Sequence, residues 1–509
     1  MYYNNQIYIG KSEEKEIFIN PKMVNRHGLI CGATGTGKTI TLKVLAEDLS
    51  DMGVPVFLSD IKGDLAGMCK DGIDNENMQN RISFFNLKEK NFTYSKCPSA
   101  FFDIYGKGGI QIRTTISEMG PILLSRILDL NDVQSDVLTI LFKIADDAEL
   151  LLIDIKDLKK MINFCSDNSK ELSKEYGMLN KQSLNSVLRA IVALEQNNAH
   201  ILFNEPSLDI NDLFRVNANG KGYINILDSS SLVQDSELYS IFMLWLLSEL
   251  FEVMPEVGDL EKPKMVFFFD EAHLLFSKAP KALLNKIEQL VKLIRSKGVG
   301  VFFITQSPLD IPDSVISQLG LKIQHALRAY TPKEQKAIKS ISQSFRANPN
   351  INIEKEVQEL ATGEALVSFL KEDGTPSIVE RTKICPPHSL MGTINDSDRE
   401  EIIKADLLYT KYDKLIDRES AYEVLSKRDE KKEKEEIEIE KKNKKEKSFM
   451  NSDGGRLVKS VLSTTGTSVG RTVVQKALKA AGINDADTAR IAGNIGATLG
   501  RGLLGSFFR

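Results

Sequence analysis

The chain has 509 residues, of which 42% are hydrophobic and 27% are charged, and its formal net charge is −4. That length is enough for two or more packed units, and the charge excludes an overall basic surface for nucleic acid but not a local basic channel. Five cysteines without a C-x-x-C pair are typical of reduced thiols in a cytoplasmic protein rather than of a disulfide framework or a zinc site.

Neither the start of the chain nor its apolar runs indicate a membrane protein. The polar start, "MYYNNQIYIGKSEEKE", is not that of a signal peptide. No apolar run reaches the roughly eighteen residues of a membrane-spanning helix. The longest candidates, such as Ile241–Leu247, are predicted to be core. We therefore expect no membrane partner, with an amphipathic membrane contact of the tail at 452–509 as the less favoured alternative.

The first elements in the chain surround a glycine-rich motif. Residues 1–27 contain two short strand patterns, "QIYIG" and "EIFINP", which predict a β-hairpin. His27–Cys31 is an apolar run suited to a buried parallel strand, and residues 40–46 carry apolar side chains at helical spacing. Between them lies "GATGTGKT", which matches the phosphate-loop pattern G-x-x-x-x-G-K-[ST] in the strand–loop–helix context that the motif requires.

This motif predicts a nucleotide-binding loop. Gly35 and Gly37 allow backbone N–H groups to close around phosphate oxygens, and the helix N-terminus adds positive potential. Lys38 can reach the terminal phosphates, and the Thr39 hydroxyl can ligate Mg²⁺. A glycine turn without a ligand is the alternative, which the complete pattern and both flanks disfavour. The predicted nucleotide-binding residues are Gly32, Ala33, Thr34, Gly35, Thr36, Gly37, Lys38 and Thr39.

The remainder of the chain predicts an α/β core that helices interrupt. Apolar residues three and four apart over several turns indicate an inserted helical subdomain, after which strand patterns return. A Glu- and Lys-rich stretch then predicts a solvated helix or linker, and a Gly- and Ala-rich basic tail predicts a small helical segment that packs on the body or on a neighbouring subunit. The predicted segments are 1–27 (hairpin), 28–115 (first part of the core), 116–200 (helical subdomain), 201–395 (second part of the core), 396–451 (charged helix or linker) and 452–509 (tail).

A pair of acids supplies the second half of the predicted site. Met265–Phe269 is an apolar strand, and Asp270 and Glu271 follow it directly. Because ligands of open parallel sheets bind at the carboxyl ends of the strands, we expect the acid pair to lie near the phosphate loop. Asp270 would hold Mg²⁺ and Glu271 would activate the attacking water. Two solvated acids at a strand end are the alternative.

A further strand pattern, Val299–Thr305, ends at Gln306, which could sense the terminal phosphate or orient water, or could be an ordinary turn residue. The letters "DEAH" at 270–273 also name a class of two-lobed RNA helicases. However, more than two hundred residues separate Lys38 from Asp270, and the Ser-Ala-Thr and paired arginine motifs of that class are missing. One core per chain, acting with its neighbours, fits better.

Taken together, the motifs resemble the HerA-like branch of the HerA/FtsK family of ring ATPases, and more closely its bacterial members. The resemblance covers most of residues 5–395 and the extreme tail. It implies a RecA-like P-loop NTPase core with a mostly parallel central sheet, a hexamer, and ATP-driven translocation on double-stranded DNA. Its segments are "GATGTGKT", "SDIKGDLAG", "RTTISEMGP", "ELFEVMPEVGDLEKPKMVFFFDEAHLLF", "IRSKGVGVFFITQSPLDIP", "QLGLKIQHALRAYTPKEQKAIK" and "RGLLG".

The resemblance also implies roles for single residues. It places an arginine that reaches the adjacent subunit's site at Arg295, with a surface helix charge as the alternative, and Arg328 is a second candidate. It implies the same roles as above for the loop, for Asp270 on Mg²⁺, for Glu271 as the water-activating base and for Gln306 as the sensor.

The chain departs from the family in one respect, and two other functions remain as alternatives to DNA translocation. Archaeal members carry a β-barrel before the loop that docks a nuclease, and the roughly thirty residues that precede the loop here are too few for it, so a nuclease partner is in doubt. A ring ATPase that handles protein is one alternative to DNA translocation, and a nucleotide-gated scaffold is another.

Overall fold

The computed structural model divides into two compact units, Met1–Tyr422 and Glu423–Arg509, which we describe separately. The predicted tail at 452–509 lies outside the residues that the structure describes. The described residues are 1–13, 15–196, 198–258, 260–276 and 281–451.

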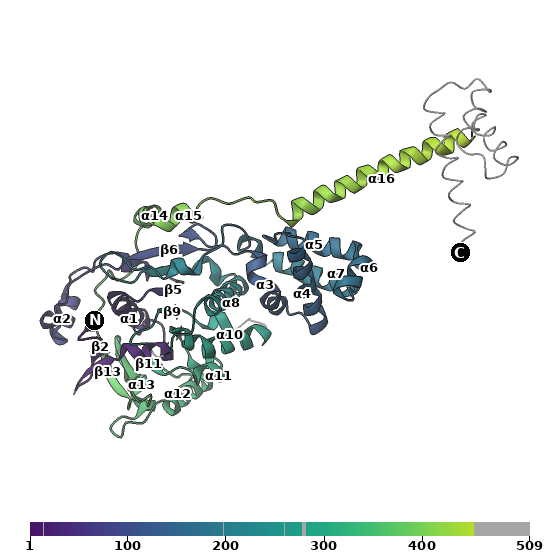
Figure 1. Cartoon of the computed structure of the whole chain (residues 1–509). Coiled ribbons are helices and arrows are strands. Elements are labelled where there is room, and N and C mark those ends of the chain that lie inside the picture. Colours follow the sequence, from purple (N-terminus) through teal and green to yellow (C-terminus); the bar gives the residue numbers. More distant parts are fainter. Residues whose placement is uncertain (14, 197, 259, 277–280, 452–509) are drawn as a thin grey trace, which may run out of the picture. The chain divides into compact units, whose positions relative to one another are not determined.

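The first unit is built on one sheet, in which thirteen strands are found among the described residues (Figure 1). Its central part is parallel and has the order β11-β4-β10-β9-β5-β8-β6-β7. The strand before the phosphate loop, β4, is separated from the acid-pair strand, β9, by β10, which is the arrangement of RecA-like P-loop ATPases. These strands are β4 (Gly28–Cys31), β5 (Val56–Asp60), β6 (Ser99–Asp103), β7 (Ile110–Gln111), β8 (Ile224–Asp228), β9 (Met265–Phe269), β10 (Val299–Thr305) and β11 (Leu321–Gln324).

An antiparallel flank extends the sheet beyond β11. β2 and β3 form the predicted antiparallel hairpin. Because β2 also pairs with β13, the hairpin belongs to the main sheet. This pairing joins the start of the chain to strands that come more than 350 residues later. The strands are β1 (Tyr2–Tyr3), β2 (Gln6–Lys11), β3 (Glu16–Ile19), β12 (Glu364–Ser368) and β13 (Glu380–Ile384).

Strand composition explains why the parallel part lies in the interior. All five residues of β9 and all seven of β10 are buried, as expected for strands that are covered on both faces. The run Ile241–Leu247 lies in α8 and is buried, as predicted, because α8 packs against α3, α9 and α10. The helices that belong to this core are α1 (Lys38–Asp51), α2 (Glu76–Phe84), α8 (Ser236–Val253), α9 (His273–Phe276), α10 (Lys281–Leu293), α11 (Asp313–Ile316), α12 (Pro332–Ser344) and α13 (Ile353–Glu359).

A group of helices follows β7 in the chain, and its members pack on one another (Figure 1). Asn131 and Asp154 begin two of them with capping boxes, in which the cap side chain and the third residue satisfy each other's free N–H groups. Gly120 and Pro121 kink the first helix. These helices are α3 (Ile116–Ile127), α4 (Asp132–Asp147), α5 (Ile155–Asp167), α6 (Ser169–Tyr176) and α7 (Lys181–Gln196).

The last described elements are helical. α14 (Asp396–Ala405) and α15 (Leu407–Tyr412) belong to the first unit, and α16 spans Ala421–Asn451. The predicted charged stretch therefore forms a helix, whose described Glu and Lys side chains between 429 and 441 are exposed. Among the residues that the structure describes, no helix is both long and apolar enough to cross a membrane.

Candidate nucleotide-binding site

The phosphate loop occupies the turn between β4 and α1. Gly35 has φ 77° and Gly37 has φ 114°, a left-handed region in which only glycine is unstrained. The loop is anchored to neighbouring strand ends, since the Gly32 N–H donates to the Thr305 carbonyl at 3.3 Å and the Ala33 N–H donates to the Ala326 carbonyl at 2.8 Å. The backbone is therefore fixed at the start of α1, where free N–H groups and the helix dipole favour an anion.

Lys38 is buried at the first position of α1 and folds back over the loop. Its Nζ donates to the Gly32 carbonyl at 2.7 Å and to the Ala33 carbonyl at 3.0 Å. Burial lowers the pKa of Lys38, and the nearby carboxylates of Glu271 and Asp270 oppose that shift. The ammonium group thus lies within electrostatic reach of both members of the acid pair. Thr39 follows it in the first turn of the same helix.

Asp270 and Glu271 occupy the carboxyl end of β9, as the sequence predicts. Both residues are 5% exposed. The Asp270 N–H donates to the Ser59 hydroxyl at 3.1 Å, and the Glu271 N–H donates to Asp270 Oδ1 at 2.9 Å. Burial, with the negative charge of Glu271 added to it, raises the pKa of Asp270 to about 7. Two adjacent buried carboxylates of this kind favour a nearby cation.

The Glu271 carboxylate is oriented by side chains from two other strands. Lys62, which follows β5, donates to Oε1 at 2.9 Å, and Gln306, which follows β10, donates from Nε2 to both oxygens at 3.2 Å. Burial raises the pKa of Glu271, but these contacts outweigh it and lower the pKa overall. The registers of β5, β9 and β10 place their carboxyl ends along one edge of the sheet, which is why the three residues meet.

Lys62 carried no predicted role in the site. Asp60 at the end of β5 shapes the turn that presents it, because its carboxylate accepts the N–H groups of Gly63 at 2.7 Å and Leu65 at 3.1 Å. A signal was available, since "SDIKGD" follows a buried strand just as the acid pair does. The partner of Lys62 depends on β5 lying beside β9, which this short stretch does not reveal.

His325 is a second residue for which no role was predicted. It is buried against the loop, with Nε2 2.8 Å from the Thr41 hydroxyl and Nδ1 2.9 Å from the Glu364 carbonyl. A Cβ on Gly32 would lie 2.6 Å from the His325 Cβ. His325 thus packs against the phosphate loop at Gly32 and binds α1 through Thr41.

The two arginine candidates lie in different places. Arg328 is exposed and lines a pocket of about 700 Å³ together with Thr34, Gly35 and Gln306 of the same chain. Arg295 lies in the 3₁₀ turn Ile294–Lys297 that precedes β10, at the amino ends of the strands. The structure therefore brings Lys38, Asp270, Glu271 and Gln306 together, with Arg328 at the adjoining pocket and Arg295 at the opposite edge.

These residues fit a triphosphate and a magnesium ion in their chemistry. Gly35 has nothing within 4 Å of the place where a Cβ would stand, so the loop backbone is open to a ligand. A buried ammonium and a pair of buried carboxylates suit phosphate oxygens and a hard cation, respectively. Lys38 with the backbone of residues 32–37 would hold the phosphates, and Thr39 with Asp270 would hold Mg²⁺.

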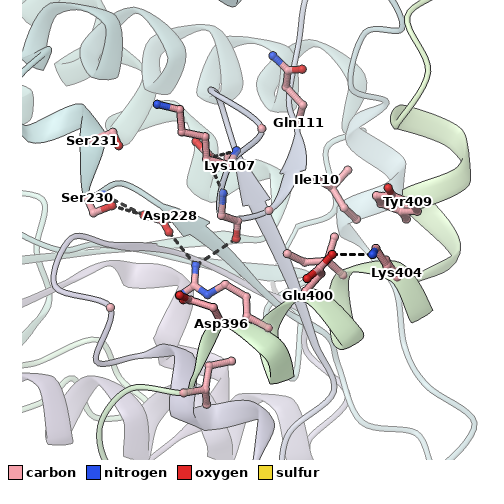
Figure 2. Close-up of a pocket in the computed structure, with 18 of the residues that line it drawn as sticks. Lys107, Ile110, Gln111, Asp228, Ser230, Ser231, Asp396, Glu400, Lys404 and Tyr409 are labelled. Carbon is pink, nitrogen blue, oxygen red and sulfur yellow. Dashed lines mark hydrogen bonds and ion pairs between the residues drawn. The ribbon is translucent and has the colours of Figure 1, made fainter.

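A second pocket, of about 720 Å³, is lined by Lys107, Asp228, Glu400 and Lys404 (Figure 2). Arg399 donates to Asp228 at 2.7 Å, and Lys404 donates to Glu400 at 2.5 Å. Because Arg399 and Lys404 are paired with acids of the same pocket, we assign no phosphate-binding role to it.

The chain is similar in sequence to two DNA repair helicases. The chain is 24% identical to the DNA double-strand break repair helicase HerA of Sulfolobus acidocaldarius over 70% of this chain and 65% of that protein. It is 24% identical to the protein of the same name from Sulfurisphaera tokodaii, over 72% of this chain and 67% of that protein. The chain thus spans just under two thirds of the first of these relatives.

Among solved structures, the plasmid coupling protein TrwB in complex with ADP and Mg²⁺ aligns with a TM-score of 0.48 and 13% identity. That alignment covers 74% of this chain and 88% of the other, and at this distance the fold description rests on the strand order given above. The sequence also matches the family described as "Helicase HerA-like C-terminal" over residues 5–509, which confirms the predicted resemblance. Since that match runs through almost the whole chain, this protein belongs to the helicase HerA-like C-terminal family.

Proposed function

We propose that this protein binds and hydrolyses ATP at the phosphate loop. The observation that carries the proposal is the Glu271 carboxylate, which Lys62 and Gln306 hold in place on the strand end beside the buried Lys38. A phosphate loop alone binds nucleotide, whereas hydrolysis also needs a group that accepts the proton of the attacking water. Glu271 is buried, oriented and next to the loop, so it meets that need.

Each residue of the proposed site has a separate task. Glu271, whose pKa lies below its ordinary value, is ionised at neutral pH and can accept a proton. Gln306 orients that carboxylate and faces the pocket, where its amide can contact water or the terminal phosphate. Mg²⁺, when bound, supplies charge that neutralises the phosphate oxygens. Lys38 can leave its two loop carbonyls for a phosphate, which offers a stronger, charged acceptor.

We further propose that hydrolysis drives translocation on double-stranded DNA by a hexameric ring in the cytoplasm. The support is family membership and the two relatives, whose names describe DNA repair helicases. The chain covers 65% of the first relative, so the activity of that whole protein is extended to this chain as a proposal. The proposal does not include a nuclease partner.

One experiment tests ATP hydrolysis and the DNA substrate together. The mass of the full chain is measured by light scattering, and ATP hydrolysis is then measured with and without duplex DNA. We expect a hexamer whose hydrolysis rises several-fold with DNA. Hydrolysis that DNA does not change would indicate a ring ATPase that handles protein. Tight ATP binding without turnover would indicate a nucleotide-gated scaffold and would contradict the role of Glu271.

A further inference from the structure

A buried cluster at the far end of α1 has no part in the nucleotide site. Asp48 and Asp51 lie one turn apart on the same face of α1, and His388 lies in the segment after β13. One ligand atom from each of the three residues lies within 4.8 Å of the other two. The side chains of Asp48 and His388 are 1% and 8% exposed, respectively, and that of Asp51 is 26% exposed.

The hydrogen bonds of His388 leave one ring nitrogen directed at the carboxylates. Nδ1 lies 3.0 Å from the Ser95 carbonyl oxygen, which can only accept, so Nδ1 carries a proton and donates it there. The other nitrogen, Nε2, is buried without a hydrogen-bond partner. An Nδ1–H that donates to a backbone carbonyl is the arrangement that orients a histidine whose Nε2 binds a metal.

The carboxylate of Asp48 also has a buried oxygen without a hydrogen-bond partner. Asp48 Oδ2 lies 2.5 Å from the amine of Met1, whereas Asp48 Oδ1 is buried without a partner. Asp51 Oδ1 pairs with Lys221 at 2.8 Å, which leaves Oδ2 on the side of His388. Glu47 braces the segment, because its carboxylate accepts the backbone N–H groups of His388 and Ser389.

The spacing within the cluster fits a metal ion better than a set of hydrogen bonds. Nε2 of His388 is 3.4 Å from Asp51 Oδ2 and 3.5 Å from Glu47 Oε2. N–H···O hydrogen bonds in proteins are about 2.7–3.2 Å long. Tetrahedral zinc with bonds of about 2.0–2.1 Å separates its ligand atoms by about 3.3–3.4 Å. His388 Nε2 and Asp51 Oδ2 are thus farther apart than in a hydrogen bond and are spaced as two ligands of one ion, and a carboxylate oxygen of Asp48 lies within 4.8 Å of both.

We propose that Asp48, Asp51 and His388 bind a zinc ion that ties the end of α1 to the segment after β13. The set of one imidazole and two carboxylates suits zinc, with water completing the tetrahedron. Because α1 starts at the phosphate loop, the ion would fix the helix that carries Lys38 from its opposite end. The cysteine pattern gave no sign of this site, because the cluster contains no cysteine and joins positions far apart in the sequence.

The test uses the full chain, freed of metal by a chelator and kept without nucleotide in excess Mg²⁺, which occupies oxygen-only sites. Zn²⁺ is titrated against a chromogenic competitor, and Co²⁺ is added separately to record the visible bands of a tetrahedral site. We expect about one Zn²⁺ per chain, a higher unfolding temperature with Zn²⁺, and tetrahedral Co²⁺ bands. His388→Gln and Asp51→Asn should each weaken Zn²⁺ binding at least about 100-fold and remove the bands.

The exposed His200 gives a matched control, since His200→Gln changes the histidine count but not the cluster. Asp51→Asn is the informative variant if His388→Gln fails to fold, because Asp51 is partly exposed. Folded protein that takes up no Zn²⁺ at micromolar free concentration would overturn the proposal and leave His388 as a protonated partner of the carboxylates. Zn²⁺ bound equally by Asp51→Asn and the parent chain would overturn it as well.

Discussion

At the scale of single residues, the orientation of Glu271 distinguishes this site from a plain nucleotide-binding loop. The backbone of Glu271 has φ 45°, a left-handed conformation that is costly for a residue with a side chain. The structure stabilises this conformation with a hydrogen bond from the Glu271 N–H to Asp270 and with the contacts of Lys62 and Gln306. Strain of this kind, held by several neighbours, is typical of functional positions.

Glu271→Gln separates binding from hydrolysis. The amide cannot accept a proton from water, and general-base contributions are about 10²–10⁴-fold, so we expect the hydrolysis rate to fall by at least about 10²-fold. ATP binding should be retained, because Lys38 and the loop are unchanged. Binding of a fluorescent ATP analogue and release of phosphate measure the two properties. The exposed Glu256→Gln is the control, and normal turnover by Glu271→Gln would contradict the assigned role.

Lys62→Ala tests whether orientation of that carboxylate matters. The change removes the 2.9 Å contact to Oε1 but leaves the contacts of Gln306. We expect hydrolysis to fall by about 10-fold, with little change in ATP binding, because misplacement of a catalytic group costs turnover rather than affinity. Lys62→Arg, which keeps a donor, should recover part of the rate. Equal rates for Lys62→Ala and the parent chain would show that Gln306 alone suffices.

His27 predicts how stability depends on pH. It is buried, its Nδ1 accepts the Val301 N–H at 3.0 Å, and burial, with Arg295 and Arg26 nearby, lowers its pKa to about 4. An unfolded histidine titrates at about 6.5, so between these values the unfolded chain binds a proton that the folded chain does not. His27 therefore contributes a fall in the free energy of unfolding as the pH drops from about 6.5 to about 4, of up to about 1.4 kcal/mol per pH unit, whereas the raised pKa of Asp270 contributes a rise over the same range.

Urea unfolding at pH 7, 5.5 and 4.5 measures this effect. His27→Gln keeps an acceptor for the Val301 N–H but cannot be protonated, so its stability should change less over that range than the parent's. The buried His325, whose pKa is also lowered to about 4, leaves part of the slope in place. Identical slopes for the two proteins would show that His27 is not the group that titrates.

At the scale of elements, β4 and β10 are neighbouring strands that lead into the site, and their side chains pack tightly against each other. Gly28 lies opposite Phe302 in the parallel register, and a Cβ on Gly28 would stand 2.3 Å from a ring carbon of Phe302. Gly28→Ala should therefore destabilise the protein by about 1–3 kcal/mol, as overpacking does in cores.

The reason can be checked with a double-mutant cycle. Phe302→Leu removes Cε1 and Cζ, two of the three ring carbons that the new Cβ meets, so the two changes together should cost less than the sum of each alone, by about 0.5 kcal/mol or more. Denaturant unfolding of the four proteins measures the coupling. If the losses of stability in Gly28→Ala and Phe302→Leu were additive, the contact between residues 28 and 302 would not be the source of the strain.

Elements with a strong local pattern could be predicted from the sequence, and their partners could not. The phosphate loop, β9 with its acid pair and β10 with Gln306 each carry a run of apolar residues that ends in polar ones, which is sufficient to place them at strand ends. Lys62 follows the same pattern, but its contact with Glu271 depends on β5 being a neighbour of β9. His325 and His388 carry no local signal, because their neighbours come from distant parts of the chain.

At the scale of the whole molecule, the position of Arg295 makes the proposed ring testable. Arg295 lies at the amino ends of the strands, whereas the phosphate loop lies at their carboxyl ends, so Arg295 is not placed to act on the nucleotide of its own chain. Arg328, in contrast, lines the pocket beside the phosphate loop of its own chain. Mixed assemblies of two inactive variants separate these two modes of action.

Arg295→Ala and Lys38→Ala should each reduce hydrolysis strongly when alone, by about 10³-fold for a trans-acting arginine. In an equal mixture assembled by co-expression, about a quarter of the subunit contacts would combine an intact loop with an intact Arg295, so about a quarter of the parent activity should return.

A mixture of Arg328→Ala with Lys38→Ala is the matched control. If Arg328 acts within its own chain, no subunit of that mixture has both the arginine and the lysine, and activity should stay at the level of the single variants. Recovery in the Arg328 mixture but not in the Arg295 mixture would assign the trans-acting role to Arg328. Recovery in neither, from assemblies that light scattering shows to be hexamers, would contradict a site shared between subunits.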